Sequence, residues 1–131
     1  MRRRLALGAL AVLIAGCPGC AGQRNSLGTG STGCFRALPA AETAVHHQGR
    51  YLGVRQVKAS TVAKRHPEFA QFGSETLCVV AFQGTFGAGS VAGANPARSG
   101  AFAVVVLDAK TAKVVAAFIV DRLPLRFTHP V

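Results

Sequence analysis

Acidic residues are scarce in this sequence. Its 131 residues include five Asp and Glu against fifteen Lys and Arg, and the formal net charge is +10 with histidine neutral. So few carboxylates leave little material for paired acid–base catalysis or for the oxygen-rich cages that hold Ca²⁺ and Mg²⁺. Most enzyme classes and hard-cation binders are therefore disfavoured, and the composition points to no cofactor.

Charged residues and long apolar runs are also few. Charged side chains make up 15% of the sequence and hydrophobic ones 50%, which is too apolar a composition for intrinsic disorder. The uncharged run at residues 5–16 is about 18 Å long as a helix, too short for a hydrocarbon core of about 30 Å. A chain of this length holds one small domain at most.

The N-terminal segment has the pattern of a secretory signal. Three arginines at positions 2–4 precede the uncharged run, which ends in small residues and a cysteine. Ile14, Ala15, Gly16 and Cys17 resemble the lipobox of bacterial lipoproteins. The resemblance implies that the Cys17 thiol carries a diacylglyceryl group, that residues 1–16 are removed, and that the new amino group is acylated. A plain secreted protein cleaved before a cysteine is the alternative.

Lipidation would fix where the protein resides. Two or three acyl chains hold a protein stably on a bilayer, whereas one chain holds it only marginally. We therefore expect an extracytoplasmic protein that is anchored to the cell membrane, or to the outer membrane of a two-membrane cell. Loss of residues 1–16 also removes three arginines, and twelve basic residues would then remain against five acidic ones. The positive charge belongs mainly to the domain itself.

Two further motifs are read in this context. Cys17 and Cys20 form a CxxC pair, but a Cys17 that is consumed as a thioether cannot cycle through a disulfide. Gly28, Gly30 and Gly33 match the dinucleotide-binding glycine spacing without the strand and helix that this fingerprint requires. We interpret residues 17–33 as a flexible Gly/Ser-rich tether, with an average span of roughly 20–25 Å.

The other cysteines suit an oxidising compartment. Pairing of Cys34 with Cys78 is the first choice, since closing a loop of about 45 residues stabilises a small domain by roughly 4 kcal/mol. Cys20 would then be left over. It is also able to pair with Cys34, with Cys78 or with another molecule, or to stay free, and the sequence does not choose among these.

The second half of the sequence predicts an antiparallel sheet. Residues 101–107 and 114–120 are apolar, β-branched runs around a polar segment at 108–113, a pattern typical of a β-hairpin. Residues 77–82 form a similar run that extends toward Phe86. These strands are apolar on both faces, so either helices and loops cover one side and the hairpin is central, or one face is an exposed patch that binds a partner. Residues 84–100 are rich in Gly, Ala and Ser and predict a long, mobile loop.

The residues before the sheet predict short helices. Pro39 is well placed to start a helix over residues 40–48, and residues 52–59 alternate as in a short strand. Pro67 starts a second short helix through Phe72, which Gly73 ends. The fold class is therefore α+β: one or two N-terminal helices packed on an antiparallel sheet of three to four strands that ends in a β-hairpin, all within residues 34–131.

The hairpin also carries a family resemblance. Residues 104–115, Val-Val-Val-Leu-Asp-Ala-Lys-Thr-Ala-Lys-Val-Val, resemble the hairpin of PepSY-like domains, in which a strand ending in Asp-Ala leads through Lys-Thr-Gly to a second apolar strand. Ala112 stands where that family usually has glycine. The resemblance implies a small extracytoplasmic module that binds proteins or occludes a partner's site, and it carries over no catalytic residue.

The candidate chemistry is limited to histidines and basic residues. His46, His47, His66 and His129 would bind a soft or borderline metal only if the fold assembled three of them, and no Cys or acid lies beside them at ligand spacing. Five cations close in the sequence predict a surface that binds anionic headgroups or wall polymers; they are Arg50, Arg55, Lys58, Lys64 and Arg65. A simply solvated basic surface is the alternative.

Two hypotheses follow from these observations. The first is a membrane-anchored, non-enzymatic binding or accessory module, with no metal and with a membrane, an anionic polymer or a protein as its partner. The second is a small extracytoplasmic lipoprotein that handles a metal or acts through thiols, using its histidines and Cys20. Nucleic acid is a poor partner for an exported protein without base-stacking aromatic motifs.

Overall fold

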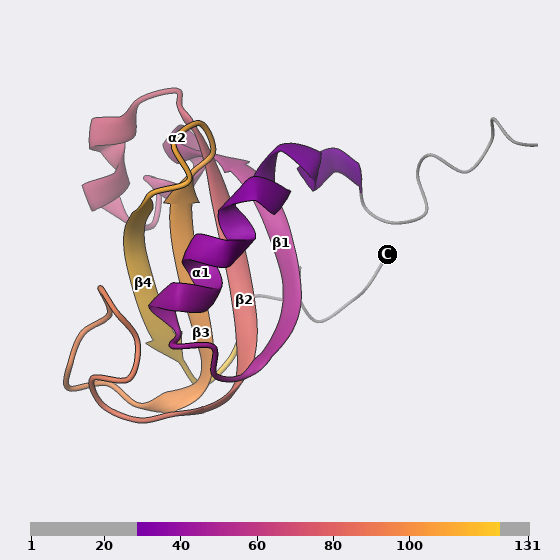
Figure 1. Cartoon of the computed structure of the whole chain (residues 1–131). Coiled ribbons are helices and arrows are strands. Elements are labelled where there is room, and N and C mark those ends of the chain that lie inside the picture. Colours follow the sequence, from indigo (N-terminus) through magenta and orange to yellow (C-terminus); the bar gives the residue numbers. More distant parts are fainter. Residues whose placement is uncertain (1–28, 124–131) are drawn as a thin grey trace, which may run out of the picture.

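The computed structural model describes residues 29–123 (Figure 1). A 3₁₀ helix and a short α-helix come first, a strand and two more short helical segments follow, and three consecutive strands complete the domain. In chain order the elements are η1 (Thr29–Ala37), α1 (Leu38–Ala44), β1 (Arg50–Lys58), α2 (Ala59–Val62), η2 (Pro67–Phe72), β2 (Thr76–Phe86), β3 (Gly100–Asp108) and β4 (Val114–Val120).

The four strands form one antiparallel sheet whose spatial order is the sequence order, β1-β2-β3-β4. The register pairs Val54 with Val80, Val80 with Val105, and Val105 with Ala117, so these residues form one row across the sheet. β2 and β3 are the central strands, which explains why both are apolar along most of their length. The predicted α+β class and the final hairpin, β3–β4, are confirmed.

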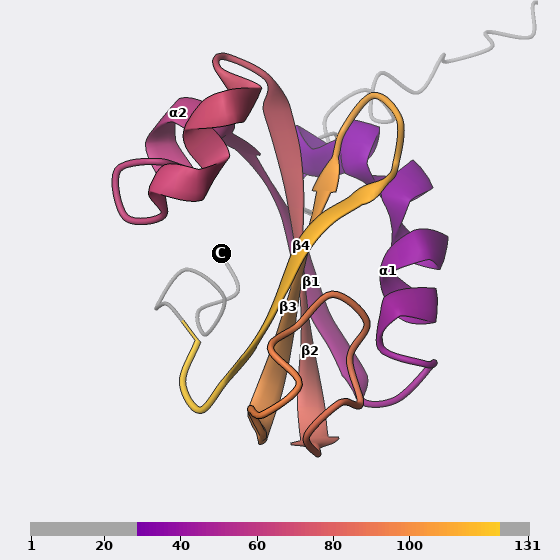
Figure 2. The same ribbon diagram turned by 90° about the vertical axis from the view of Figure 1, so that its left-hand side faces the viewer.

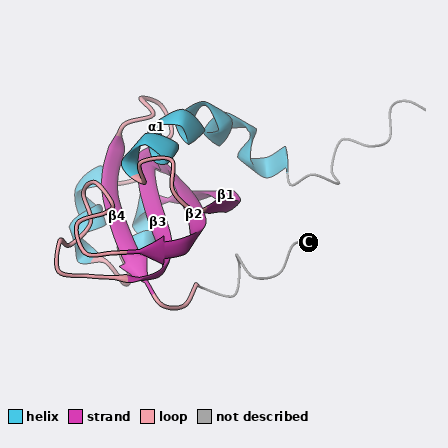
Figure 3. Ribbon diagram, turned by 60° about the horizontal axis from the view of Figure 1, so that its bottom comes forward, coloured by secondary structure: helices cyan, strands magenta, loops and turns pink. Residues whose placement is uncertain are grey.

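Helices cover both faces of this sheet (Figure 2). Viewed along the sheet, η1 and α1 lie on one side, and α2 and η2 lie on the other, near one end of the strands. Cover by helices is therefore found on both sides of the sheet, but the hairpin is not central, because β4 is an edge strand. Figure 3 shows α1 lying across the sheet from a different direction.

The larger core lies between the sheet and α1. It contains Ala41 and Ala44 of α1 and Val45, the residue that follows this helix. These three pack against strand residues that face the helix. Those strand residues are fully or almost fully buried: Cys78, Val80, Phe82, Phe86, Ala103, Val105, Leu107, Ala117 and Ile119. Small alanines on α1 let the helix backbone come close to the bulky valines and phenylalanines of the sheet.

The smaller core lies on the opposite face, under α2 and η2. Phe69 is 1% exposed and packs with Leu77 and Val106. The rings of Phe69 and Phe118 are 6.3 Å apart, and the His66 ring is 5.4 Å from that of Phe118. The predicted short helix from Pro67 to Phe72 with Gly73 at its end is confirmed as η2.

The helix expected at 40–48 is shorter and starts earlier. It begins at Leu38, with Pro39 in its first turn, and ends at Ala44. The chain then reverses through His46 and His47, which both have positive φ, so the helix cannot continue. The strand expected at 52–59 is found as β1, Arg50–Lys58, because Ala59 already starts α2.

Two expected irregular segments are partly ordered. Residues 17–28 of the expected tether lie outside the described residues, but residues 29–33 belong to η1, which packs against β1 and β2. The expected loop 84–100 is shorter, since β2 extends to Phe86 and β3 begins at Gly100. Within the connection 87–99, Val91 is buried in the larger core, and this contact ties the loop to the domain. None of the described helices has the length and apolarity needed to cross a membrane.

Candidate functional site

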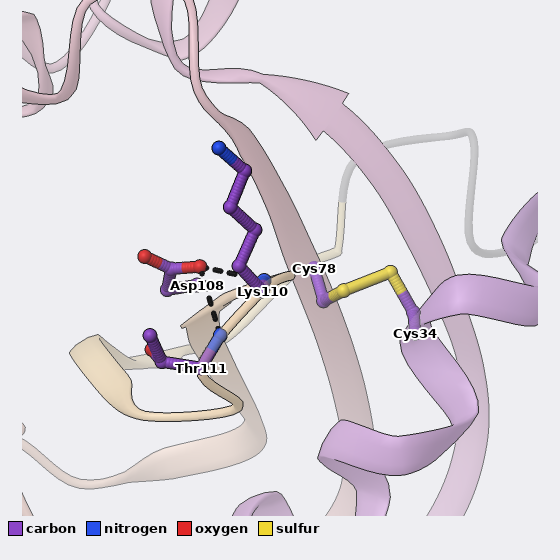
Figure 4. The surroundings of a disulfide bond; sticks show 5 residues. All are labelled: Cys34, Cys78, Asp108, Lys110 and Thr111. Carbon is purple, nitrogen blue, oxygen red and sulfur yellow. Dashed lines mark hydrogen bonds between the residues drawn. A yellow bond between two sulfur atoms is a disulfide. The ribbon is translucent and has the colours of Figure 1, made fainter.

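A buried disulfide links the N-terminal part of the described chain to the sheet. Cys34, in the second half of η1, is bonded to Cys78 on β2, with the two Cα atoms 5.5 Å apart (Figure 4). Both half-cystines are fully buried in the larger core. The pairing expected from the sequence is therefore confirmed, and it ties the N-terminal end of the domain to a central strand. Cys17 and Cys20 lie outside the described residues.

The disulfide also marks one end of the sheet. Because the strands are antiparallel, β1 and β3 end where β2 and β4 begin. At this end Lys58 of β1 pairs with Thr76 of β2, and Leu77 of β2 pairs with Asp108 of β3. Thr76 and Leu77 are two positions and one position from Cys78. The connections 59–75 and 109–113 therefore lie at the same end as the disulfide, at the top of Figure 1.

The structure does not gather the five predicted cations into one surface. Arg50 and Lys58 stand at opposite ends of β1, about 26 Å apart along the strand, and Arg55 lies between them. Arg50 donates a hydrogen bond from Nη2 to Oε1 of Gln83, at 2.6 Å. Only Lys58, Lys64 and Arg65 of this set lie at the disulfide end.

Two lysines that the sequence interpretation missed complete this cluster. Lys110 and Lys113 belong to the turn between β3 and β4 and are exposed. We name five exposed cations at this end, on β1 and on the connections 59–75 and 109–113, the basic end, and they are Lys58, Lys64, Arg65, Lys110 and Lys113. Among the described residues, none of them forms an ion pair. The antiparallel order of the predicted strands was the signal that would have found them. It places the turn at residues 108–113 at the same end of the sheet as the start of the strand at residue 77, and so beside the other three cations.

Three carboxylates lie near the basic end: Asp108 and Glu68 have side-chain contacts, and Glu75 is exposed. Asp108 Oδ1 accepts hydrogen bonds from the backbone N–H groups of Lys110 at 2.6 Å and Thr111 at 3.2 Å (Figure 4). Glu68 lies 3.3 Å from Nδ1 of His66. Asp108 therefore shapes the turn, as its position in the sequence predicts. Its side chain holds the turn that carries Lys110 and Lys113.

The paired histidines terminate a helix and do not face a common ligand. His47 N–H donates to Glu42 O at 2.8 Å, which is the six-to-one bond of a Schellman motif. His46 takes the left-handed position that usually belongs to glycine, with φ +53°, and His47 follows with φ +57°. His66 lies on the opposite face of the sheet beside Phe118. The described part of the chain contains no group of three potential metal ligands, and His129 lies beyond it.

A shallow hollow of about 180 Å³ lies beside this helix end. Its lining includes Glu42, His47 and Gln48 from the end of the helix and Tyr51 and Phe82 from the sheet. The Tyr51 ring packs edge-on to Phe82 with centroids 6.2 Å apart and remains 42% exposed. Burial raises the pKa of Tyr51 above its usual value of 10.0, because the phenolate is less well hydrated there.

Comparison of the chain with protein-family models found no match. Comparison with curated proteins found none either. No solved structure matched the fold. The resemblance of residues 104–115 to PepSY-like hairpins therefore stays a prediction. The structure does give a reason why glycine suits the position of Ala112, since this residue has φ +56° in the left-handed region.

Proposed function

We propose that this protein is a membrane-anchored extracytoplasmic lipoprotein that serves as a non-enzymatic binding or accessory module at the cell surface. The lipid is attached at Cys17, and residues 1–16 are the signal that is removed. The folded domain that follows the tether carries the binding surfaces. Anionic headgroups, wall polymers and proteins are the partner classes that its excess of cations suits.

The observation that carries this proposal is the buried Cys34–Cys78 disulfide. Structural disulfides persist in oxidising compartments and are rare in the cytosol. The bond joins two segments 44 positions apart, and both sulfurs lie in the core, out of reach of most reductants. A structural disulfide of this kind fits a protein exported through a signal such as residues 1–16.

The alternative is a lipoprotein that handles a metal or acts through thiols. It would depend on the histidines and on Cys20. Among the described residues, however, His46 and His47 are used to end α1, and His66 packs against Phe118 on the other face of the sheet. Cys34 and Cys78 already bond to each other. The binding module is therefore the reading that the geometry favours.

The mass of the native protein tests the proposal. The protein is extracted from cells with detergent, its thiols are alkylated before and after reduction, and the metal content of the same sample is measured. We expect a chain that starts at Cys17 and carries a diacylglyceryl group, with Cys34 and Cys78 protected until reduction and no stoichiometric metal.

A Cys17→Ala variant supplies the control. It should lose the lipid mass and remain unprocessed, while its Cys34–Cys78 bond still forms. A native chain without lipid, in which Cys17 and Cys20 form a reversible disulfide, would overturn the proposal. A tightly bound metal that is lost in a His46→Ala/His47→Ala variant would favour the alternative.

A further inference from the structure

The chain enters the folded domain at the basic end. The described chain begins at Thr29, and Cys34 is bonded to Cys78 only two positions from Thr76, the start of β2. At most about 40 Å of fully extended chain separates Cys17 from Thr29. A lipid on Cys17 therefore keeps the point where the chain enters the domain within about 40 Å of the bilayer, and that point belongs to the basic end, while the 87–99 connection lies at the other end of the strands.

The cations at this end are available for an external partner. All five side chains of the basic end are exposed, and none is in an ion pair with a described residue. Lys110 and Lys113 project from a turn of five residues, and Lys64 and Arg65 from the link between α2 and η2. Connections of this kind are free to approach a surface without disturbing the sheet.

We infer that the basic end faces the membrane and binds anionic lipid headgroups, so that the domain is held in one orientation on the bilayer. The inference rests on the proposed lipid anchor. Each cation within a Debye length of an anionic leaflet strengthens the attraction about fivefold. Two or three simultaneous contacts suffice to bias the orientation once the lipid has removed the cost of bringing the domain to the surface.

Two exposed arginines at the opposite end of the strands provide a charge-matched control for the basic end. Arg98 and Arg122 are exposed there, in the 87–99 connection and just after β4. A Lys110→Gln/Lys113→Gln variant and an Arg98→Gln/Arg122→Gln variant lose the same charge from opposite ends of the strands. The Lys110 backbone N–H that bonds to Asp108 is retained in the first variant. Unfolding in urea should confirm that both variants fold.

Hydrogen exchange on reconstituted vesicles tests the orientation. The native lipidated protein is placed in vesicles of phosphatidylcholine alone, or with one third phosphatidylglycerol, and exchange is followed by mass spectrometry. We expect exchange in residues 59–75 and 109–113 to slow severalfold only on the anionic vesicles, and to recover in 0.5 M salt. The Lys110→Gln/Lys113→Gln variant should lose most of this protection, and the Arg98→Gln/Arg122→Gln variant should keep it.

The outcomes separate this inference from the proposed function. If the protein carries the lipid but shows equal exchange on both kinds of vesicle, the inference is wrong and the anchor stands. Equal loss of protection in both variants would mean that net charge acts without orientation, which also overturns it. If the protein carries no lipid, the proposed function fails, and with it the anchored orientation.

Discussion

Tyr51 is the residue whose chemistry can be followed most directly. The sequence contains one tyrosine and no tryptophan, so tyrosinate absorbance near 295 nm reports Tyr51 alone. Because burial raises the pKa of its hydroxyl, the midpoint in the folded protein should lie above 10.0. In urea the midpoint should return to the usual value.

The same shift gives stability a pH dependence. The raised pKa favours the neutral hydroxyl in the folded state, so its contribution is complete below about pH 10. As the pH rises further, the unfolded chain releases its proton first, and the folded state loses stability. A Tyr51→Phe variant should remove this part of the decline. An identical alkaline decline in the variant would assign it to other groups.

His46 is a residue where glycine should be better. A left-handed conformation costs a non-glycine residue roughly 1–2 kcal/mol, and part of this is offset by the greater freedom of glycine in the unfolded chain. His46→Gly should therefore raise the free energy of unfolding by about 0.5–1 kcal/mol, measured in urea. A loss of stability in this variant would show that the imidazole makes a stabilising contact.

Gly49→Ala, at the same turn, should lower the free energy of unfolding, in contrast to His46→Gly. Gly49 has φ +80°, and an added Cβ would stand 2.7 Å from the ring of Phe86 and 3.0 Å from the carbonyl oxygen of Gln83. We expect a loss of more than about 1 kcal/mol from the combined strain and overlap.

The individual residues show where prediction from the sequence stopped. Cys34 and Cys78 were paired correctly because few partners were available and the compartment was indicated. The predicted cationic surface stays a prediction, but closeness in sequence did not reveal that β1 carries Arg50 and Lys58 to opposite ends of the sheet. The left-handed conformation of His46 and His47 had no signal in the residue types, because histidine is not the usual residue there.

At the scale of elements, the β3–β4 turn depends on one carboxylate. Asp108 Oδ1 accepts from two backbone N–H groups, and the Asp108 carbonyl accepts from Ala112 N–H at 2.9 Å. Asp108→Ala should lower the free energy of unfolding by about 1 kcal/mol, because the two N–H groups lose their side-chain acceptor. Thermal or urea unfolding measures the difference.

Asp121→Ala is the matched control for this turn. Asp121 is exposed and follows the last residue of β4, at the end of the sheet opposite Asp108. Its replacement by alanine removes the same charge as Asp108→Ala. Its effect should stay within about 0.5 kcal/mol, as for most surface positions. Equal losses in the two variants would mean that charge, and not the geometry of the turn, accounts for the effect of Asp108→Ala.

Elements with strong patterns were predicted well, and those defined by turns less so. The strands beginning near Leu77, Ala101 and Val114 are long apolar runs, and η2 has Pro67 and Gly73 at its ends. The limits of α1 were misplaced because its end depends on backbone conformation at His46 and not on an apolar pattern. The burial of Val91 is a tertiary contact that a Gly/Ala-rich loop does not reveal.

At the scale of the whole molecule, the disulfide should dominate stability. Bridging segments 44 positions apart removes loop-closure entropy from the unfolded chain. A Cys34→Ala/Cys78→Ala variant should lose about 4 kcal/mol, and its urea midpoint should be insensitive to reductant. The wild-type protein should move toward the variant when it is reduced under denaturing conditions and refolded. A midpoint equal to that of the oxidised wild type would contradict the entropic account.

The disulfide also decides how the domain carries mechanical load. A pull on the chain before Cys34 reaches β2 directly across the sulfur–sulfur bond to Cys78. The segments α1, β1, α2 and η2 lie within the covalent loop that this bond closes, outside the force path between the N-terminal side and β2. A protein held at its N-terminal side against shear would therefore stretch from residues 29–33 of η1 directly to a central strand and onward, and α1, α2 and η2 would not be drawn out unless the bond were first reduced.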